Sequence, residues 1–164
     1  VDKRWHFAAN WPSMGPQGFV SPGTTHAMPR LPDHWNAIET ANEELPFRLV
    51  TAPARNFLNS TFNETSTSKR RERRPMLMMH SADAARLSIA DGDPIRISNA
   101  RGALELHAEL FDGLQPGVVV AESVWPNDAF KTGLGINVLT GADPAGPTGG
   151  AAFHDNRVAI TAAQ

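Results

Sequence analysis

Short β-rich segments recur along the chain from residue 47 onward, and they constrain the fold more than any other feature of the sequence. The clearest of them has apolar residues at 104, 106, 108 and 110 that alternate with Glu105, His107 and Glu109, as a strand with one buried face requires. Six segments are predicted as strands: 47–51, 76–80, 94–98, 103–110, 117–121 and 157–161. The predicted fold is therefore mainly β.

Tight turns and one brief helix connect these strands. Residues 82–88 have the apolar spacing of a short helix with Ser81 as its expected N-cap, and the run Asp-Gly-Asp at 91–93 turns the chain sharply after it. Residues 99–102 are predicted to form a hairpin turn. A closed six-stranded barrel with short helices plugging its ends satisfies this pattern, because closure leaves no strand edge exposed.

The first 46 residues differ in composition from the rest. They hold three of the four tryptophans and six of the thirteen prolines. Proline interrupts helices and removes strand donors, so this part is expected to be irregular. We expect an irregular Pro/Trp-rich arm or linker at 1–46 and one barrel domain at 47–164.

The start of the chain and its apolar runs bear on where the protein works. The chain begins at Val1 and shows no basic segment followed by an apolar stretch, so we expect no signal peptide and a piece of a longer protein. Its aliphatic runs are far shorter than the ~20 residues that cross a bilayer, so no membrane insertion is expected. The expected compartment is the cytoplasm, with the periplasm left open.

Common catalytic and metal-binding signatures are missing from the sequence. It has no cysteine, which removes disulfides, thiolate zinc sites and iron–sulfur clusters. Its six histidines never pair at the i, i+3 or i, i+4 spacing of two ligands on one face of a helix. No catalytic residue and no metal ligand is therefore predicted in this chain.

Residues 69–74, Lys-Arg-Arg-Glu-Arg-Arg, form a strongly basic run in a chain whose formal net charge is −2. Polar residues precede the run without apolar periodicity, so a solvated, mobile loop is expected. An adaptor or nucleic-acid-binding barrel that uses this loop stays open as an alternative. No aromatic residue interleaves with the basic ones to stack on bases, so no nucleic-acid partner is expected.

Two loops have the composition of ligand contacts. The first, 51–64, carries amides, hydroxyls and an arginine that can bind a phosphate. The second, 125–150, is long and rich in glycine, and its internal apolar residues argue against disorder. The polar candidates are Thr51, Arg55, Asn56, Asn59, Ser60, Asn137 and Thr140.

Three motifs together resemble a known domain. They are MHSADAARLSIADGDPIRISNARG at 79–102, PGVV at 116–119 and GINVLTGAD at 135–143. In this order and spacing they are similar to the C-terminal molybdopterin-dinucleotide-binding domain of the dimethyl sulfoxide reductase superfamily. The resemblance extends over about 47–160 and is specific, because several motifs match at once.

The resemblance implies a double-psi β-barrel whose two loops bind and orient a bis(molybdopterin guanine dinucleotide) cofactor with molybdenum or tungsten. The remaining domains of a parent oxidoreductase would share this cofactor, and the barrel alone is not expected to be catalytic. Carried over by position, the implied cofactor contacts are Thr51, Asn59, Ser60, Trp125, Asn137, Leu139, Thr140 and His154. Pro53, Arg55 and Asn56 of the first loop complete the set of predicted cofactor-binding residues.

The chain also departs from the family's pattern. Many relatives have Gly-Arg directly after the opening Thr, where this chain has Ala52 and Pro53 with Arg55 beyond them, so which arginine contacts the cofactor is left open. A free-standing barrel subunit, as in formylmethanofuran dehydrogenases, is a further alternative to a domain of a larger subunit.

Overall fold

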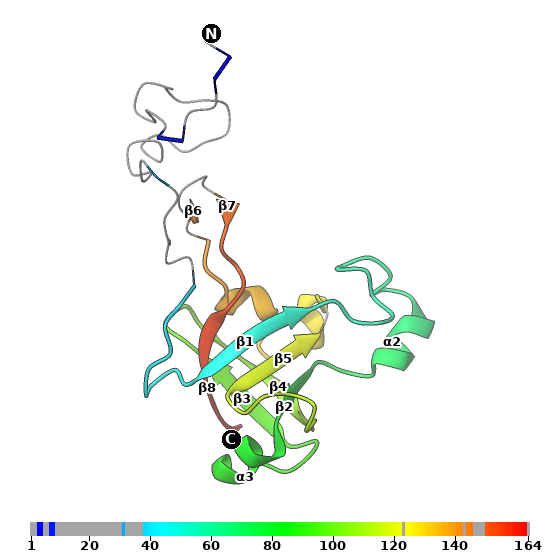
Figure 1. Ribbon diagram of the computed structural model, residues 1–164. Helices are drawn as coiled ribbons and strands as arrows, with labels where there is room; N and C mark the ends of the chain where they lie inside the picture. Colours follow the sequence, from blue (N-terminus) through cyan, green and yellow to red (C-terminus); the bar gives the residue numbers. More distant parts are fainter. Residues whose placement is uncertain are drawn as a thin grey trace. The chain divides into compact units, whose positions relative to one another are not determined.

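A computed structural model of the protein describes residues 3–4, 7–8, 31, 38–122, 124–142, 144–145 and 150–163. Within these residues, six strands close into one barrel in the order β1-β5-β2-β4-β3-β8 (Figure 1). The strands are β1 Phe47–Ala52, β2 Met76–Met79, β3 Pro94–Ser98, β4 Ala103–Leu110, β5 Val118–Glu122 and β8 Asn156–Ala162. Each lies within one residue of its predicted bounds, so the six-stranded barrel is confirmed.

The order of the strands around the barrel differs from their order in the sequence. β1 pairs in parallel with β5, with Val50 opposite Val120, and β2 pairs in parallel with β4, with Met78 opposite Glu109. The other neighbours are antiparallel. Two interleaved parallel pairs joined by antiparallel neighbours make a double-psi β-barrel, so this part of the prediction is confirmed as well.

Alternate residues of the strands fill the interior of the barrel. In β4, Leu104, Leu106 and Ala108 are buried, whereas Glu105 and His107 between them are half-buried. This alternation follows from the strand itself, because successive side chains point to opposite faces. Each fully buried Leu or Ile side chain stabilises the fold by about 1.5–3 kcal/mol relative to an exposed one, so the interior holds the barrel together.

One end of the barrel is covered by the short helix α3, Ser81–Leu87. Its N-cap is His80, whose Nδ1 accepts a hydrogen bond from the backbone N–H of Ala82 at 3.0 Å. The prediction that Ser81 is the cap is therefore wrong by one residue. His80 is extended, with φ −68° and ψ 141°, and the helical conformation already begins at Ser81.

Asp83 fastens α3 to the barrel wall. Its buried carboxylate accepts hydrogen bonds from the backbone N–H of Gly117 at 2.6 Å and from Arg86 Nη2 at 2.8 Å. Gly117 has φ +84°, a conformation that glycine adopts without a Cβ penalty. The helix ends at Ser88, which adopts the left-handed conformation with φ 57° and ψ 40°.

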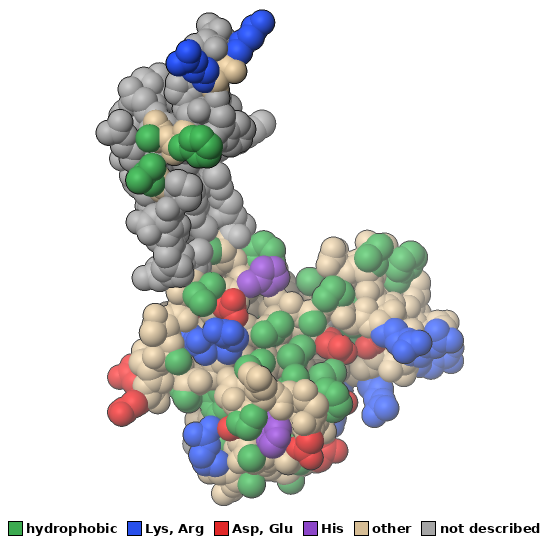
Figure 2. Space-filling model, viewed as in Figure 1, with side chains coloured by type: hydrophobic (Ala, Val, Ile, Leu, Met, Phe, Trp, Pro, Cys, Tyr) green, Lys and Arg blue, Asp and Glu red, His purple; other side chains and the backbone are tan. Residues whose placement is uncertain are grey.

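The basic run begins within a helix. Helix α2 covers Ser66–Glu72, so the prediction of a mobile loop at 69–74 is wrong for its first four residues. The helix buries none of its residues, so no apolar periodicity could have indicated it. Lys69 pairs with Glu64 at 3.3 Å on its exposed surface. Lys and Arg side chains gather over α2 in the space-filling view (Figure 2).

Val1–Ile38 and Ala142–Phe153 form a separate compact unit, and residues 39–46 cluster with the barrel. In the separate unit, the short strands β6 Pro144–Ala145 and β7 Gly150–Ala151 pair antiparallel. Most of the expected irregular arm at 1–46 lies outside the described residues, and the boundary at residue 47 stays a prediction. Among the described residues, no helix has both the length and the apolar character needed to span a membrane.

Candidate functional site

Three loops leave the barrel at the same end. Because β1 and β5 are parallel neighbours and Ala52 lies opposite Glu122, the segments that follow these strands start side by side (Figure 1). The turn between β3 and β4 is also here, since β2 is antiparallel to β5 and parallel to β4. We call residues 53–64, 99–102 and 124–141 the loop end of the barrel, and the opposite end with α3 the helix end.

The loops after β1 and β5 pack against each other. Phe57 and Trp125 meet edge to face, with ring centroids 4.9 Å apart and ring planes inclined by 75°, and both side chains are buried. Asn63 is buried as well, and its Nδ2 donates a hydrogen bond to the backbone carbonyl of Val124 at 3.2 Å. Such aromatic pairs and buried hydrogen bonds fix relative positions, so the two loops form one packed surface.

Most of the predicted residues of the first loop face solvent. Arg55, Asn59 and Ser60 are exposed, and their side chains make no hydrogen bond with any residue in the described part of the chain. Pro53 is exposed and Thr51 is half-buried near the end of β1. The first loop therefore offers a guanidinium, an amide and a hydroxyl to a ligand.

Asn56 instead fastens the first loop to α2. Its backbone N–H and its Nδ2 donate to Glu72 Oε1 at 2.7 Å and 2.6 Å. Its Oδ1 accepts a hydrogen bond from Arg71 Nη1 at 3.4 Å. Both ends of the amide are engaged within the protein, so Asn56 supports the shape of the loop.

The second loop contains two short 3₁₀ helices, η2 Asn127–Ala129 and η3 Ile136–Leu139. Asn127 Oδ1 joins them by accepting a hydrogen bond from the backbone N–H of Gly135 at 3.1 Å. A Cβ on Gly135 would lie 2.9 Å from the same oxygen, so a larger residue here would displace the Asn127 side chain from this hydrogen bond.

Three of the predicted residues lie on or directly after η3. Asn137 is exposed, and its side chain makes no hydrogen bond with a described residue. Leu139 is fully buried and anchors η3 in the core. Thr140 Oγ1 donates to the backbone carbonyl of Asn137 at 3.0 Å, which closes the turn. The segment therefore presents Asn137, while Leu139 and Thr140 maintain its structure.

The last two predicted residues have different environments. Trp125 is buried against Phe57, so its ring links the loops instead of facing solvent. His154 is exposed and lies two residues before β8.

Residues that hold the loops in place were missed by the sequence analysis. Glu72 binds Asn56, and both Asn99 and Arg101 donate to the carbonyl of Leu139. These contacts join residues 16, 40 and 38 positions apart, so no local pattern could reveal them. Arg101 and Gly102 were predicted as part of the hairpin turn at 99–102, and their contact with the second loop was not.

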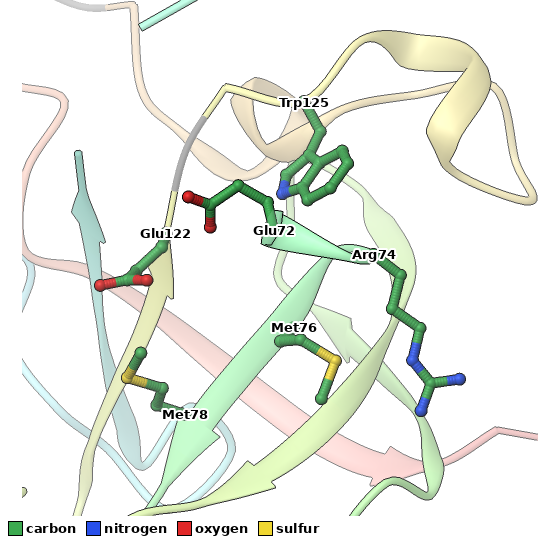
Figure 3. Close-up of a pocket in the computed structure, with 6 residues that line it drawn as sticks. All are labelled: Glu72, Arg74, Met76, Met78, Glu122 and Trp125. Atoms are coloured by element: carbon green, nitrogen blue, oxygen red, sulfur yellow. The ribbon is translucent and has the colours of Figure 1, made fainter. Parts of the chain in front are cut away.

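A small pocket lies between the end of α2 and the strands β2 and β5 (Figure 3). Its volume is about 40 Å³, which is room for a few water molecules and not for a ring system. It is lined by Glu72, Arg74, Met76, Met78, Glu122 and Trp125. Of these, the sequence analysis had predicted Trp125 as a site residue.

Two carboxyl groups share this pocket. The carboxyls of Glu72 and Glu122 lie on one side of it, and Arg74 extends away from both (Figure 3). Burial raises the pKa of the Glu122 carboxyl, and the negative charges of Glu72 and Glu109 raise it further. The pocket is therefore a place where a negative charge is disfavoured.

Exposed large apolar side chains gather at the loop end. Leu58, Phe62, Val124 and Leu134 are between 36% and 62% exposed, whereas at the helix end Phe111 alone among the described residues is exposed to this degree. Exposed apolar side chains concentrated at one end of a barrel indicate a surface that another molecule or domain covers.

The chemistry that the loop end offers is binding. It presents a guanidinium at Arg55, amides at Asn59 and Asn137, and nearby apolar side chains. In the part of the chain that the structure describes, no three His, Asp or Glu side chains come together to hold a metal ion. Amides read the edges of heterocycles and guanidinium groups bind phosphates, so a nucleotide-like ligand fits these residues.

Comparison with known proteins supports this view. The chain is similar to the probable oxidoreductase YoaE of Bacillus subtilis (strain 168), with 39% identity over 80% of this chain and 19% of that protein. It is 31% identical to the dimethyl sulfoxide reductase DmsA of Escherichia coli (strain K12), over 73% of this chain and 15% of that protein. The chain thus spans less than a fifth of the length of these relatives.

Solved structures share the fold. The acetylene hydratase from Pelobacter acetylenicus superposes with a TM-score of 0.68 at 14% identity, over 87% of this chain and 23% of that protein. The family model of the molybdopterin dinucleotide binding domain matches residues 47–157, which is more than half of the chain. The chain therefore belongs to the molybdopterin dinucleotide binding domain family, as found in enzymes of the dimethyl sulfoxide reductase family.

Proposed function

We propose that the barrel binds and orients the pterin guanine dinucleotide cofactor of a molybdenum or tungsten oxidoreductase, as the C-terminal domain of its catalytic subunit. The observation that carries the proposal is the pair of packed loops at the loop end, joined through Phe57 and Trp125. When bound, such a cofactor supplies the electron-transfer or oxygen-atom-transfer chemistry, and the protein supplies binding and orientation.

The residues of the loop end divide this work by their chemistry. Arg55 is suited to a phosphate of the dinucleotide, because its planar guanidinium donates two parallel hydrogen bonds. Asn59 and Asn137 each offer a donor and an acceptor to the edge of a ring system. The exposed apolar side chains of Leu58 and Phe62 would pack beside the rings or against another domain.

The remaining parts of the parent protein complete the site in this proposal. The chain spans less than a fifth of its curated relatives, and no metal-binding cluster is found among its described residues. We therefore assign the protein ligand to the metal, the substrate contacts and the opposite wall of the cofactor site to other domains.

The test uses the full-length protein that carries this chain. Asn59→Ala and Asn137→Ala each remove the hydrogen bonds of one amide, worth about 1 kcal/mol, so the double variant should retain at least tenfold less molybdenum and dinucleotide per mole of protein. Gln115→Ala removes an exposed amide at the helix end and should load like the unmodified protein. Full loading of the Asn59 and Asn137 double variant would contradict the proposal.

The alternative of nucleic-acid binding rests on the basic residues at 69–74. Several of them have partners in the structure: Lys69 pairs with Glu64, Arg71 contacts Asn56, and Arg74 Nη2 donates to the carbonyl of Gly92 at 3.4 Å. Binding of DNA or RNA that weakens with salt and disappears in Arg70→Gln and Arg73→Gln variants would support the alternative. Our proposal expects no such binding.

A further inference from the structure

The turn between β3 and β4 holds η3 in place. Asn99 Nδ2 donates a hydrogen bond to the backbone carbonyl of Leu139 at 2.8 Å and another to the carbonyl of Arg157 at 3.3 Å. Asn99 Oδ1 accepts a hydrogen bond from the backbone N–H of Arg101 at 2.9 Å. One amide thus shapes the turn with its oxygen and binds η3 with its nitrogen.

Arg101 makes a second attachment to the same carbonyl. Its Nη1 donates to the carbonyl of Leu139 at 3.2 Å, and its Nη2 pairs with Glu39. Glu39 is itself fixed, because its Oε2 accepts a hydrogen bond from the backbone N–H of Arg157 at 2.6 Å. A Cβ on Gly141 would lie 3.3 Å from Arg101 Nη2, so the guanidinium lies close against the backbone that follows η3.

Gly102 makes room for the side chain of Val138. A Cβ on Gly102 would lie 2.6 Å from Val138 Cγ2, closer than real Cβ contacts come. Val138 packs against the core, so its side chain cannot swing freely away. Gly102 does not have a positive φ, so glycine is required here by the contact with η3 and not by the backbone angles of the turn.

We propose that Asn99, Arg101 and Gly102 are positioning residues for the cofactor, because they set where η3 presents Asn137. The inference rests on the proposed function. It adds that the turn between β3 and β4 holds the contact residue Asn137 in place through η3. The helix η3 has four residues, too few to hold its shape alone, so contacts from outside must fix it. Binding residues need such a supporting layer to stay within a fraction of an ångström of their working geometry.

The test uses the full-length protein: one variant introduces a steric clash between residue 102 and Val138, and a second variant removes it. Gly102→Ala should push Val138 and η3 outward and lower the content of molybdenum and dinucleotide per mole of protein about tenfold, since small misplacements cost large factors. In the double variant Gly102→Ala/Val138→Ala, the clashing Cγ2 is gone, and the cofactor content should return to the level of the unmodified protein. A loss of stability that does not arise from this contact would not be reversed by removing the two methyl groups of Val138.

Hydrogen exchange provides a readout that does not depend on the cofactor. The amide of Val138 donates to the carbonyl of Gly135 at 3.1 Å, and that of Thr140 donates to the carbonyl of Asn137 at 3.2 Å. In Gly102→Ala both amides should exchange faster, while the amide of Val50 in β1 should keep its rate. The double variant should restore slow exchange at both.

A matched control separates positioning from general damage. Gly117→Ala strains the backbone at the helix end, where φ is +84°, and should leave the cofactor content unchanged. The inference is wrong if Gly102→Ala keeps its cofactor, if Val138→Ala fails to restore it, or if Gly117→Ala loses as much.

Asn137→Ala distinguishes failure of this inference from failure of the proposed function. Loss of cofactor in Asn137→Ala without loss in Gly102→Ala overturns the positioning role alone. If Asn137→Ala keeps its full cofactor content, then η3 is not a cofactor contact, and the proposed role of η3 and this inference are both overturned.

Discussion

The rings of Trp125 and Phe57 meet edge to face and thereby join the loop after β5 to the loop after β1. Trp125→Ala should lower the free energy of unfolding of the chain by about 3–5 kcal/mol, because it leaves a cavity between the loops. Urea unfolding followed by circular dichroism measures this change. Phe111→Ala, at an exposed ring of the helix end, is the control and should cost far less. Equal losses in both variants would show that the two loops are not packed together.

Helix α2 should depend on Glu72. Glu72→Ala leaves the backbone N–H and the side-chain amide of Asn56 without their acceptor, at a cost of about 1–3 kcal/mol. A helix this short and unburied does not persist by itself, so amide exchange within 66–72 should accelerate. Glu64→Ala removes an exposed pair with Lys69 and should have little effect. Unchanged exchange in Glu72→Ala would contradict this role.

The stability of the barrel should depend on pH through Glu122. Burial and the charges of Glu72 and Glu109 raise the pKa of its carboxyl in the folded protein above that in the unfolded chain. The folded state therefore binds this proton more tightly than the unfolded chain does. The protonated carboxyl stabilises the folded state at low pH, and this stabilisation is lost as the pH rises through the pKa of Glu122 in the folded protein.

Glu122→Gln cannot ionise, so it should be more stable than the unmodified chain at neutral pH. This difference in stability should shrink as the pH falls to about 4, below the ordinary pKa of a Glu carboxyl. The urea midpoints of both chains at the two pH values provide the measurement. A difference that is the same at both values would show that ionisation of Glu122 is not its cause.

Glycine at the C-cap of α3 should make the folded protein more stable. Ser88 caps this helix with φ 57° and ψ 40°, which strains a residue that has a Cβ. Ser88→Gly should therefore raise the free energy of unfolding by about 0.5–1 kcal/mol. Ala85→Gly, inside the same helix, should lower it by about 1 kcal/mol, which makes the pair a control for the effect of glycine itself. A loss of stability in Ser88→Gly would refute the assignment of strain.

The strands of the barrel were predictable because their pattern is local. Residues 104, 106 and 108 alternate with polar neighbours, and this period follows from the geometry of a single strand. Helix α2 was not predictable, since none of its residues is buried and its support comes from Asn56, which lies 16 positions before Glu72.

The sequence indicated which loops form the candidate site, but it did not indicate which of their residues face solvent and which pack inside. Asn59 and Asn137 are exposed, as ligand contacts should be, but Leu139 and Trp125 are buried and serve the packing of the loops. Side-chain type alone does not distinguish these cases. Burial depends on what the rest of the chain places beside a residue, and that information is not local.

β8 is the last strand of the barrel in the sequence, yet in the closed barrel it lies between β1 and β3. While the chain is being synthesised, β1 and β3 therefore each keep one edge without a partner until residues 156–162 have left the ribosome. Unpaired edges of this kind recruit other chains, so we expect the nascent protein to need a chaperone over this interval.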